Sequence, residues 1–159
     1  MRTLAGTLLL ALCFATHAEE PGICRVNESV YRGNQPRDFV RLREMGIKTV
    51  LDLRGGAIHA PKERKQVEAA GMEYVSVGLS GIFPPTKKQM SDILALLEDT
   101  SRGPVFVHCR RGADRTGLVI ACYPIAHDHW TNEQAIREAR EQGFSRAEIL
   151  MRNYLQNWQ

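Results

Sequence analysis

The sequence predicts a single α/β domain whose central sheet of four to five strands is mostly parallel and flanked by helices. Short apolar runs alternate with stretches of helical periodicity, an order typical of parallel strands joined by helices. A length of 159 residues suits one domain with one core. The composition, 43% hydrophobic and 25% charged, is that of an ordinary globular protein and excludes disordered and collagen-like classes.

The first 18 residues are predicted to be a signal peptide. Arg2 supplies a positive charge, residues 4–14 form an apolar core too short to span a bilayer, and small residues around Ala18 suit cleavage there. We therefore expect residues 19–159 to form the mature domain, exported to the periplasm or secreted, with no stable membrane span after cleavage. An uncleaved anchor or a buried first helix is the alternative. The formal net charge of +3 gives no indication of nucleic-acid binding.

Strand and helix patterns alternate in the amino-terminal half of this mature chain. Two short runs around an Asn-Glu turn predict a hairpin, and later apolar runs predict further strands. Proline suits the first turn of a helix and glycine its carboxyl end, which places the helix boundaries. The elements expected are strands at 23–26 and 29–32, a helix from Pro36 to Gly46, an interior strand at 47–53, a charged and exposed helix at 61–70, and a strand at 73–77.

Helices dominate the carboxy-terminal half. Three Ser/Thr-x-x-Glu/Gln sequences are capping boxes, each of which predicts a helix start. Proline inside a helical pattern should kink or end the helix. The elements expected are a helix capped at Thr86–Gln89, a buried strand at 105–107, a helix at 118–125 interrupted by Pro124, and two helices capped at Thr131–Gln134 and Ser145–Glu148, the last with an apolar stripe of Met151, Tyr154, Leu155 and Trp158.

A ten-residue loop, residues 108–117, joins the strand at 105–107 to the following helix. Its backbone N–H groups therefore lie at a helix amino terminus, where unpaired donors and partial positive charge attract anions. The same field lowers the pKa of a nearby thiol, which makes Cys109 a candidate thiolate nucleophile. The guanidinium of Arg115 could grip two phosphate oxygens and neutralise charge in the transition state.

The other residues of this loop suit the binding of a phosphate dianion. Gly112 permits close approach of the backbone, and the Thr116 hydroxyl could stabilise the thiolate when it leaves. Arg110, Arg111 and Arg115 together would form a cationic mouth that attracts anionic substrates. The residues predicted to contact substrate are His108, Arg110, Arg111, Gly112 and Ala113, and Arg54 could reach the phosphate or instead pair with Asp52.

The pattern His-Cys-x-x-Gly-x-x-Arg-Thr-Gly resembles the phosphate-binding loop of the cysteine-based protein tyrosine phosphatase superfamily, closest to the compact dual-specificity branch of bacterial, exported type. Residues 23–158 follow a similar order of elements, although only the loop is specific. The resemblance implies hydrolysis of phosphate monoesters through a phosphocysteine on Cys109, without a metal or other cofactor. It implies a phosphorylated protein as the substrate and partner, with tyrosine or dual specificity.

The general acid expected from this resemblance is missing from its usual place. Many related phosphatases carry an Asp in the loop that corresponds to residues 78–85, and this chain has no acidic residue between Glu73 and Asp92. Asp114 is the candidate general acid, although the neighbouring arginines would lower its pKa. Asp92 is an alternative on a solvated helix face, and a structural role for Asp114 also stays open.

Other functions are compatible with parts of the pattern. The paired Arg110 and Arg111, with Asp114, make a phosphoinositide or inositol phosphate the alternative substrate. The missing acid suggests a catalytically weak phosphate-binding module, and a rhodanese-like sulfur transferase would leave Arg115 unexplained. Of the other cysteines of the mature chain, Cys122 is predicted to lie in the core and Cys24 to be free or paired.

Overall fold

A computed structural model of the chain describes residues 22–56, 59–145 and 149–158. The predicted signal peptide and most of the Ser145–Glu148 capping box lie outside these residues. Within the described ranges, no helix is both long enough and apolar enough to span a membrane.

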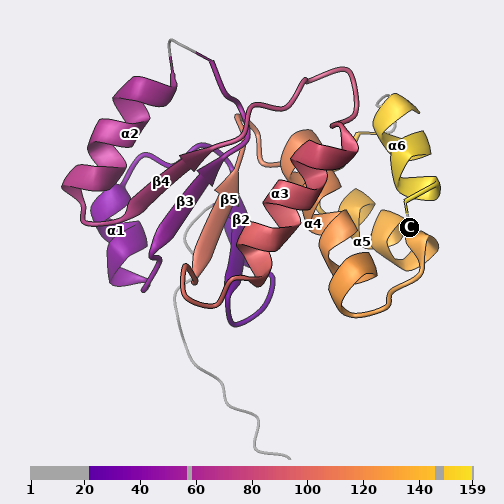
Figure 1. Ribbon diagram of the computed structural model, residues 1–159, viewed down its shortest axis with the longest axis horizontal. Coiled ribbons are helices and arrows are strands. Elements are labelled where there is room, and N and C mark those ends of the chain that lie inside the picture. Colours follow the sequence, from indigo (N-terminus) through magenta and orange to yellow (C-terminus); the bar gives the residue numbers. More distant parts are fainter. Residues whose placement is uncertain (1–21, 57–58, 146–148, 159) are drawn as a thin grey trace, which may run out of the picture.

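Five strands form one sheet in the order β1-β2-β5-β3-β4 (Figure 1). Their bounds are β1 (Ile23–Arg25), β2 (Val30–Gly33), β3 (Thr49–Asp52), β4 (Glu73–Ser76) and β5 (Val105–His108). β1 pairs antiparallel with β2, and all the other pairs are parallel. His108 at the end of central β5 is in register with Gly33 of β2 and Asp52 of β3. The carboxyl ends of three parallel strands therefore meet at one edge, where ligand sites of open α/β sheets lie.

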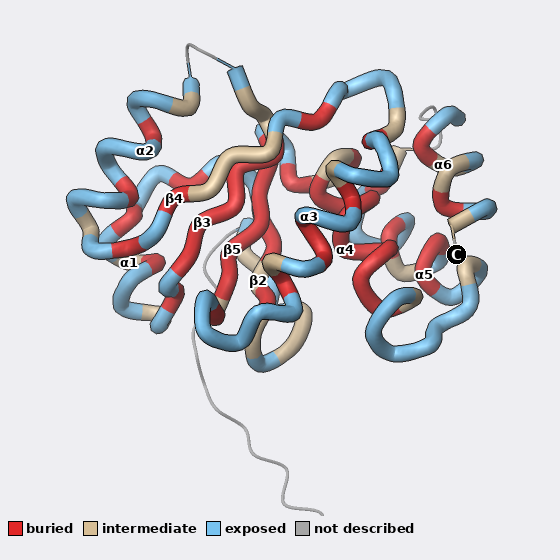
Figure 2. The backbone as a smooth tube through the Cα atoms, viewed as in Figure 1, coloured by how far each residue is buried: buried red, intermediate tan, exposed pale blue. Residues whose placement is uncertain are grey.

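Helices cover both faces of this sheet (Figure 1). They are α1 (Phe39–Glu44), α2 (Ala60–Ala69), α3 (Lys87–Glu98), α4 (Asp114–His127), α5 (Asn132–Glu141) and α6 (Ile149–Gln156). Alternate side chains of each strand point to opposite faces, so Phe106 of β5 packs with α1 and α2, whereas Val105 and Val107 pack with α3 and α4. Burial of each large apolar side chain contributes about 1.5–3 kcal/mol. Figure 2 shows the buried residues concentrated along the strands and the inward faces of the helices.

The structure confirms the predicted fold class and most of the predicted elements. The hairpin lies at one edge of the sheet, the capping boxes at Thr86–Gln89 and Thr131–Gln134 form as expected, and Gly46 ends α1 with a φ of 88°. Met151 and Leu155 of the expected apolar stripe are buried in the core. The sequence patterns therefore locate the elements to within a few residues.

Three expectations about helices are wrong in detail. The first helix begins at Phe39 rather than near Pro36, because Asp38 caps it by accepting a hydrogen bond from the backbone N–H of Arg41 at 2.9 Å. The helix that contains Pro124 runs from Asp114 to His127, so it begins within the expected loop, and of the two effects expected of this proline, a kink or an end, the end does not occur. The charged helix α2 is not wholly exposed, since Glu63 and Val67 on it are buried.

Candidate active site

The loop that carries the candidate nucleophile follows β5 and turns into α4. β5 is buried along its whole length, which fixes the position from which Cys109 leaves the sheet. Gly112 has a φ of 74°, and a Cβ there would lie 2.5 Å from the carbonyl carbon and oxygen of Gly33. Only glycine fits this crossing of two backbones, which brings the loop against the end of β2.

Hydrogen bonds from the loop converge on the Cys109 sulfur. The side chain is almost completely buried, and the backbone N–H of Gly112 donates to Sγ at 3.2 Å. Burial opposes ionisation, but hydrogen bonds from the side chain and backbone of Thr116 and from the backbone N–H groups of Gly112 and Arg111 outweigh it, so the pKa of the thiol is lowered. The thiolate is therefore the favoured form at a lower pH than for an ordinary cysteine.

A second buried cysteine shows what the loop contributes. Cys122 lies within α4 with its thiol in the core, as predicted, and burial alone raises its pKa. Two buried thiols thus shift in opposite directions, and the difference comes from the donors around Cys109. Thr116 is also fully buried, and its hydroxyl has no hydrogen-bond partner of standard geometry among the described residues, which leaves it available to the sulfur.

Neighbouring elements hold the loop in this conformation. From β2, Arg32 Nη2 donates to the Gly112 carbonyl at 3.1 Å, and Nη1 of the same guanidinium lies 3.5 Å from Glu138 Oε1 on α5. The Gln35 backbone N–H donates to the Arg110 carbonyl at 3.3 Å. The sequence gives little indication of these contacts, since Arg32 and Gly112 are 80 residues apart.

The arginines of the loop surround a cavity of about 400 Å³. Its lining residues are Gly81, Arg110, Arg111, Asp114 and Arg115. Arg110 and Arg111 are exposed, whereas Arg115 is half-buried. The cationic mouth expected from the sequence is present, and Gly81 of the loop at residues 78–85 also lines it. Ile82 and Phe83 of that loop are 67% and 63% exposed, so an apolar rim lies next to the cationic cavity.

Asp114 is engaged on both carboxylate oxygens. Oδ2 is bound by the guanidinium of Arg111, and Oδ1 accepts a hydrogen bond from the backbone N–H of Ser145 at 3.1 Å. These two contacts tie the carboxylate to Arg111 and to the backbone of Ser145, which favours the structural role over that of general acid. Asp92 is exposed on α3 and pairs with Lys88 at 2.7 Å.

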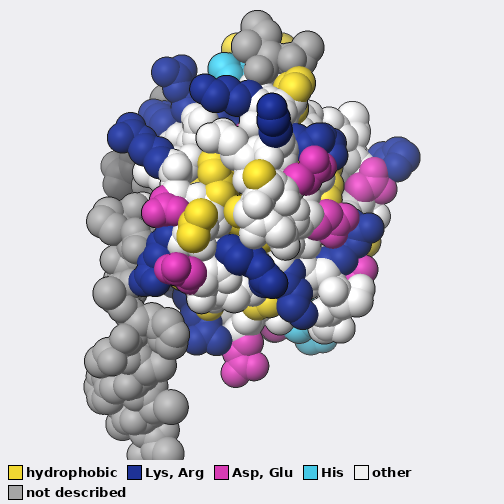
Figure 3. All heavy atoms as spheres, turned by 90° about the vertical axis from the view of Figure 1, so that its left-hand side faces the viewer, with side chains coloured by type: hydrophobic (Ala, Val, Ile, Leu, Met, Phe, Trp, Pro, Cys, Tyr) yellow, Lys and Arg dark blue, Asp and Glu magenta, His cyan; other side chains and the backbone are white. Residues whose placement is uncertain are grey.

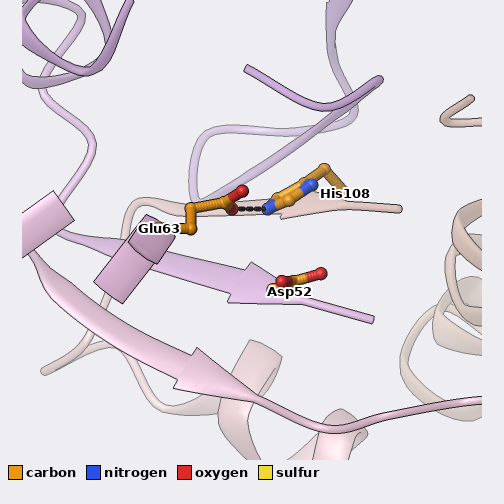
Figure 4. Close-up of side chains that lie close together, drawn as sticks. All are labelled: Asp52, Glu63 and His108. Atoms are coloured by element: carbon orange, nitrogen blue, oxygen red, sulfur yellow. Dashed lines mark ion pairs between the residues drawn. The ribbon is translucent and has the colours of Figure 1, made fainter. Parts of the chain in front are cut away.

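Two residues expected to contact substrate instead belong to a buried polar cluster behind the loop. His108 is fully buried, and its Nε2 lies 2.7 Å from Oε1 of Glu63 on α2, as Figure 4 shows. The Arg54 side chain is only 6% exposed; it bonds both oxygens of Asp52, at 2.9 and 2.8 Å, and also contacts Glu63. Arg54 thus takes the alternative of pairing with Asp52, and the His108 ring lies beside Glu63.

This cluster has the spacing of a cation site but already contains its cation. The ligand atoms of Asp52, Glu63 and His108 lie within 4.8 Å of one another. The guanidinium of Arg54 bridges the two carboxylates, and Tyr74 donates its hydroxyl to Asp52 Oδ2 at 2.8 Å. One guanidinium therefore pairs with both carboxylates of the cluster.

Two further cavities extend the charged surface. One of about 600 Å³ borders the loop and carries three guanidinium groups; its lining residues are Ile23, Asn34, Gln35, Pro36, Arg37, Asp38, Arg41 and Arg110. Another, of about 320 Å³, lies beside α2 and includes His59 and Lys62. Figure 3 looks onto the side that carries α1 and α2, where Lys and Arg side chains are numerous and Asp and Glu lie between them.

Solved structures of phosphatases share this architecture. The core catalytic domain of the PP-IP phosphatase SIW14 from S. cerevisiae gives a TM-score of 0.77 at 23% identity, covering 86% of this chain and 85% of that one. TpbA from P. aeruginosa gives a TM-score of 0.74 at 23% identity, covering 87% and 86%. The fold is therefore that of the dual-specificity phosphatase class.

Residues 16–157 match the family described as DSP-PTPase phosphatase fused to NAD+ kinase, and the chain belongs to this family. Inositol diphosphatase DSP3 of Arabidopsis thaliana is 31% identical over 104 residues, which cover 61% of this chain and 50% of the relative. Dual specificity protein phosphatase TpbA of Pseudomonas aeruginosa is 26% identical over 122 residues, covering 76% and 54%. The chain spans about half the length of these relatives.

Proposed function

We propose that this protein is a cysteine-dependent phosphatase that hydrolyses phosphate monoesters of proteins, with tyrosine or dual specificity. The observation that carries the proposal is the Cys109 sulfur, which is buried and yet has a lowered pKa because loop donors surround it. Family membership and the shared fold support the same conclusion. The thiolate is the nucleophilic form of cysteine, so the site is prepared for attack on phosphorus.

The reaction proceeds in two steps. The Cys109 thiolate attacks phosphorus, the S–P bond forms, and the bond to the leaving oxygen breaks while Arg115 and the loop N–H groups hold the other phosphate oxygens. Water then attacks the phosphocysteine, the S–P bond breaks, and sulfur leaves as a thiolate that Thr116 stabilises. Protons are exchanged with solvent in both steps. Neither step requires a metal or organic cofactor.

The surroundings of the loop favour an aryl phosphate. Asp114 is already bound on both oxygens, so the leaving oxygen departs without a dedicated acid in this arrangement. A phenolate, whose conjugate acid has a pKa of about 10, leaves more readily than an alkoxide under these conditions. Phe83 and Ile82 also offer an apolar rim for an aromatic ring beside the cavity. Phosphotyrosine has both the phenolate leaving group and the aromatic ring.

Cys109→Ser tests the nucleophile. We expect turnover of an aryl phosphate to be lost while binding of a phosphate analogue is retained, because the loop N–H groups and Arg115 remain in place. Cys24→Ser is the matched control, since Cys24 is also a free cysteine but is exposed. Phosphate release by the Cys109 variant at a rate near that of the control would overturn the assignment.

An inositol phosphate is the second candidate substrate. The cavity of about 600 Å³ beside the loop could accept further phosphate groups through Arg37, Arg41 and Arg110. Relatives named as inositol diphosphatases support this alternative. Comparison of kcat/KM for a phosphotyrosyl peptide and an inositol phosphate panel decides between the two, and we expect the peptide to be preferred. Arg37→Ala should lower kcat/KM for the inositol compounds alone if they are the substrates.

We also propose that the protein is exported and cleaved after Ala18. The support is the charge, apolar core and small residues of the first 18 positions. Amino-terminal sequencing of protein from fractionated cells should find Glu19 first, in the periplasmic or secreted fraction. Intact Met1 on protein in the cytosolic fraction would contradict export.

A further inference from the structure

We propose that Arg32 of β2 is a positioning residue that fixes one peptide group of the phosphate-binding loop, so that the N–H group of Ala113 points toward the bound phosphate. Arg32 lies behind the loop, where it lines a cavity of about 180 Å³ with Tyr123 of α4 and Glu138 of α5, and it does not line the cavity at the loop mouth. The inference rests on the proposed function, because it concerns how the substrate of that reaction is held.

The guanidinium of Arg32 is held in one orientation. The side chain is only 4% exposed; its Nη2 donates to the Gly112 carbonyl oxygen at 3.1 Å, and its Nη1 lies 3.5 Å from Glu138 Oε1. The planar guanidinium cannot turn without losing one of these contacts. Because β2 pairs with β5, from which the loop leaves the sheet, Arg32 lies on the strand next to the loop (Figure 1).

A carbonyl group that is fixed in this way also fixes an N–H group. The Gly112 carbonyl belongs to the same peptide group as the Ala113 N–H, and this peptide bond is trans. In a planar trans peptide group the C=O and N–H bonds point in opposite directions. Since the carbonyl points toward Arg32 behind the loop, the Ala113 N–H points away from Arg32.

A second peptide group of the loop shows the same relation. The Gln35 N–H, which follows β2, donates to the Arg110 carbonyl at 3.3 Å. The other end of that peptide group is the Arg111 N–H, which is among the donors that lower the pKa of Cys109. A donor from outside the loop that binds a carbonyl therefore leaves the N–H of the same group directed inward.

The Ala113 N–H is available to a ligand. It has no acceptor among the described residues, whereas the N–H groups of Arg111 and Gly112 are directed to the Cys109 sulfur. Ala113 immediately precedes α4, so the helix does not use this donor. A phosphate oxygen accepts it in the bound state, and the charge of that oxygen strengthens the hydrogen bond. A charged donor on the Gly112 carbonyl also polarises the N–H at the other end of the peptide group.

An NMR titration of the wild-type protein with inorganic phosphate tests the direction of this N–H. We expect the amide proton of Ala113 to move downfield as phosphate binds, because it then donates to a charged oxygen. Asp99 is the internal reference, since its N–H is bound to the Ala95 carbonyl at the end of α3. In Arg32→Met most of the Ala113 shift should be lost. An Ala113 resonance that stays in place in the wild type, or that moves equally in Arg32→Met, overturns the proposal.

Steady-state kinetics test whether the orientation matters for turnover. Arg32→Met should lower kcat for an aryl phosphate by about 10–100-fold, with a smaller change in KM, because a donor placed for the transition state acts mainly on kcat. The affinity for vanadate, whose adduct with a thiolate has the planar oxygens of the transition state, should fall by a similar factor. Arg32→Lys keeps a charged donor and should recover part of both losses.

Arg25→Met is the matched control, because Arg25 lies on β1 of the same hairpin and donates to the Asn27 carbonyl at 3.0 Å. A folded Arg32→Met protein with the kcat and vanadate affinity of this control would refute the role of Arg32. A residue that only stabilised the fold would lower the free energy of unfolding without separating kcat from KM.

The wild-type titration needs no variant, so it tests the proposal even if Arg32→Met does not fold. It measures the binding of phosphate alone and is independent of turnover. A protein that binds phosphate through Ala113 but releases none from an aryl phosphate would contradict the proposed function only.

Discussion

At the residue scale, the chemistry depends on how many hydrogen-bond donors reach one sulfur atom. Cys109 and Cys122 are both buried, yet the pKa of Cys109 is lowered and that of Cys122 is raised. Only Cys109 lies where a strand ends and a loop directs its N–H groups inward. The position of the thiol relative to the backbone, rather than burial itself, therefore determines whether it is reactive.

Thr116→Val tests the contribution of one donor to the thiolate. Valine has nearly the same shape but no hydroxyl, so we expect the pKa of Cys109 to rise by about one unit. A raised pKa reduces the thiolate fraction at acid pH, and the acid limb of the kcat/KM profile should move to higher pH. Thr116→Ser is the matched control, because it keeps the hydroxyl. A pH profile in the valine variant that coincides with wild type would exclude this role.

At the scale of elements, some of the site could be predicted from sequence because it is local. The loop, its helix and the Cys109–Arg115 spacing occupy one continuous stretch, and the structure has this loop between β5 and α4, although α4 begins at Asp114. Glu63 was missed, since charged residues occupy half of the positions of α2 and no apolar stripe marks an inward face. Only Val67, one turn later, indicates which side is buried. The Arg32 and Glu63 contacts join distant segments, which no local pattern encodes.

Asp52→Asn tests the buried cluster that joins β3 to α2. Burial opposes the charge of Asp52, but hydrogen bonds from Arg54 outweigh it and lower the pKa below its ordinary value of 3.8. A carboxyl group whose pKa is lowered on folding stabilises the protein at any pH above its pKa in the unfolded state. This stabilisation is lost as the pH falls through its pKa in the folded state. We expect the variant to lose about 3–5 kcal/mol at neutral pH, because Arg54 keeps a buried charge without this partner.

Urea unfolding over a pH series measures both effects. The difference in the free energy of unfolding between wild type and Asp52→Asn should become smaller as the pH falls below 3.8, the ordinary pKa of this carboxyl group. The control is Asp92→Asn, whose exposed pair with Lys88 should cost no more than about 1 kcal/mol. A difference in the free energy of unfolding that is the same at acid and neutral pH would show that the charge of Asp52 does not contribute to stability as described.

At the scale of the whole molecule, the sheet brings both halves of the site together. The ends of β2, β5 and β3 lie in register, so Gly33, His108 and Asp52 meet at one edge. One face of the sheet supports the loop through α4 and α5, and the other supports it through α2 and the buried cluster. The two cores on either side of the sheet therefore fix a single arrangement of the phosphate-binding loop.

The central claim is that phosphate passes through a covalent bond to Cys109. The most direct test is rapid acid quenching during turnover of an aryl phosphate, followed by peptide mass spectrometry. We predict a phosphoryl group on the peptide that contains residue 109 in the wild-type protein and none in Cys109→Ser. Turnover with no phosphoryl group on that residue, or with the group on another side chain, would contradict the account.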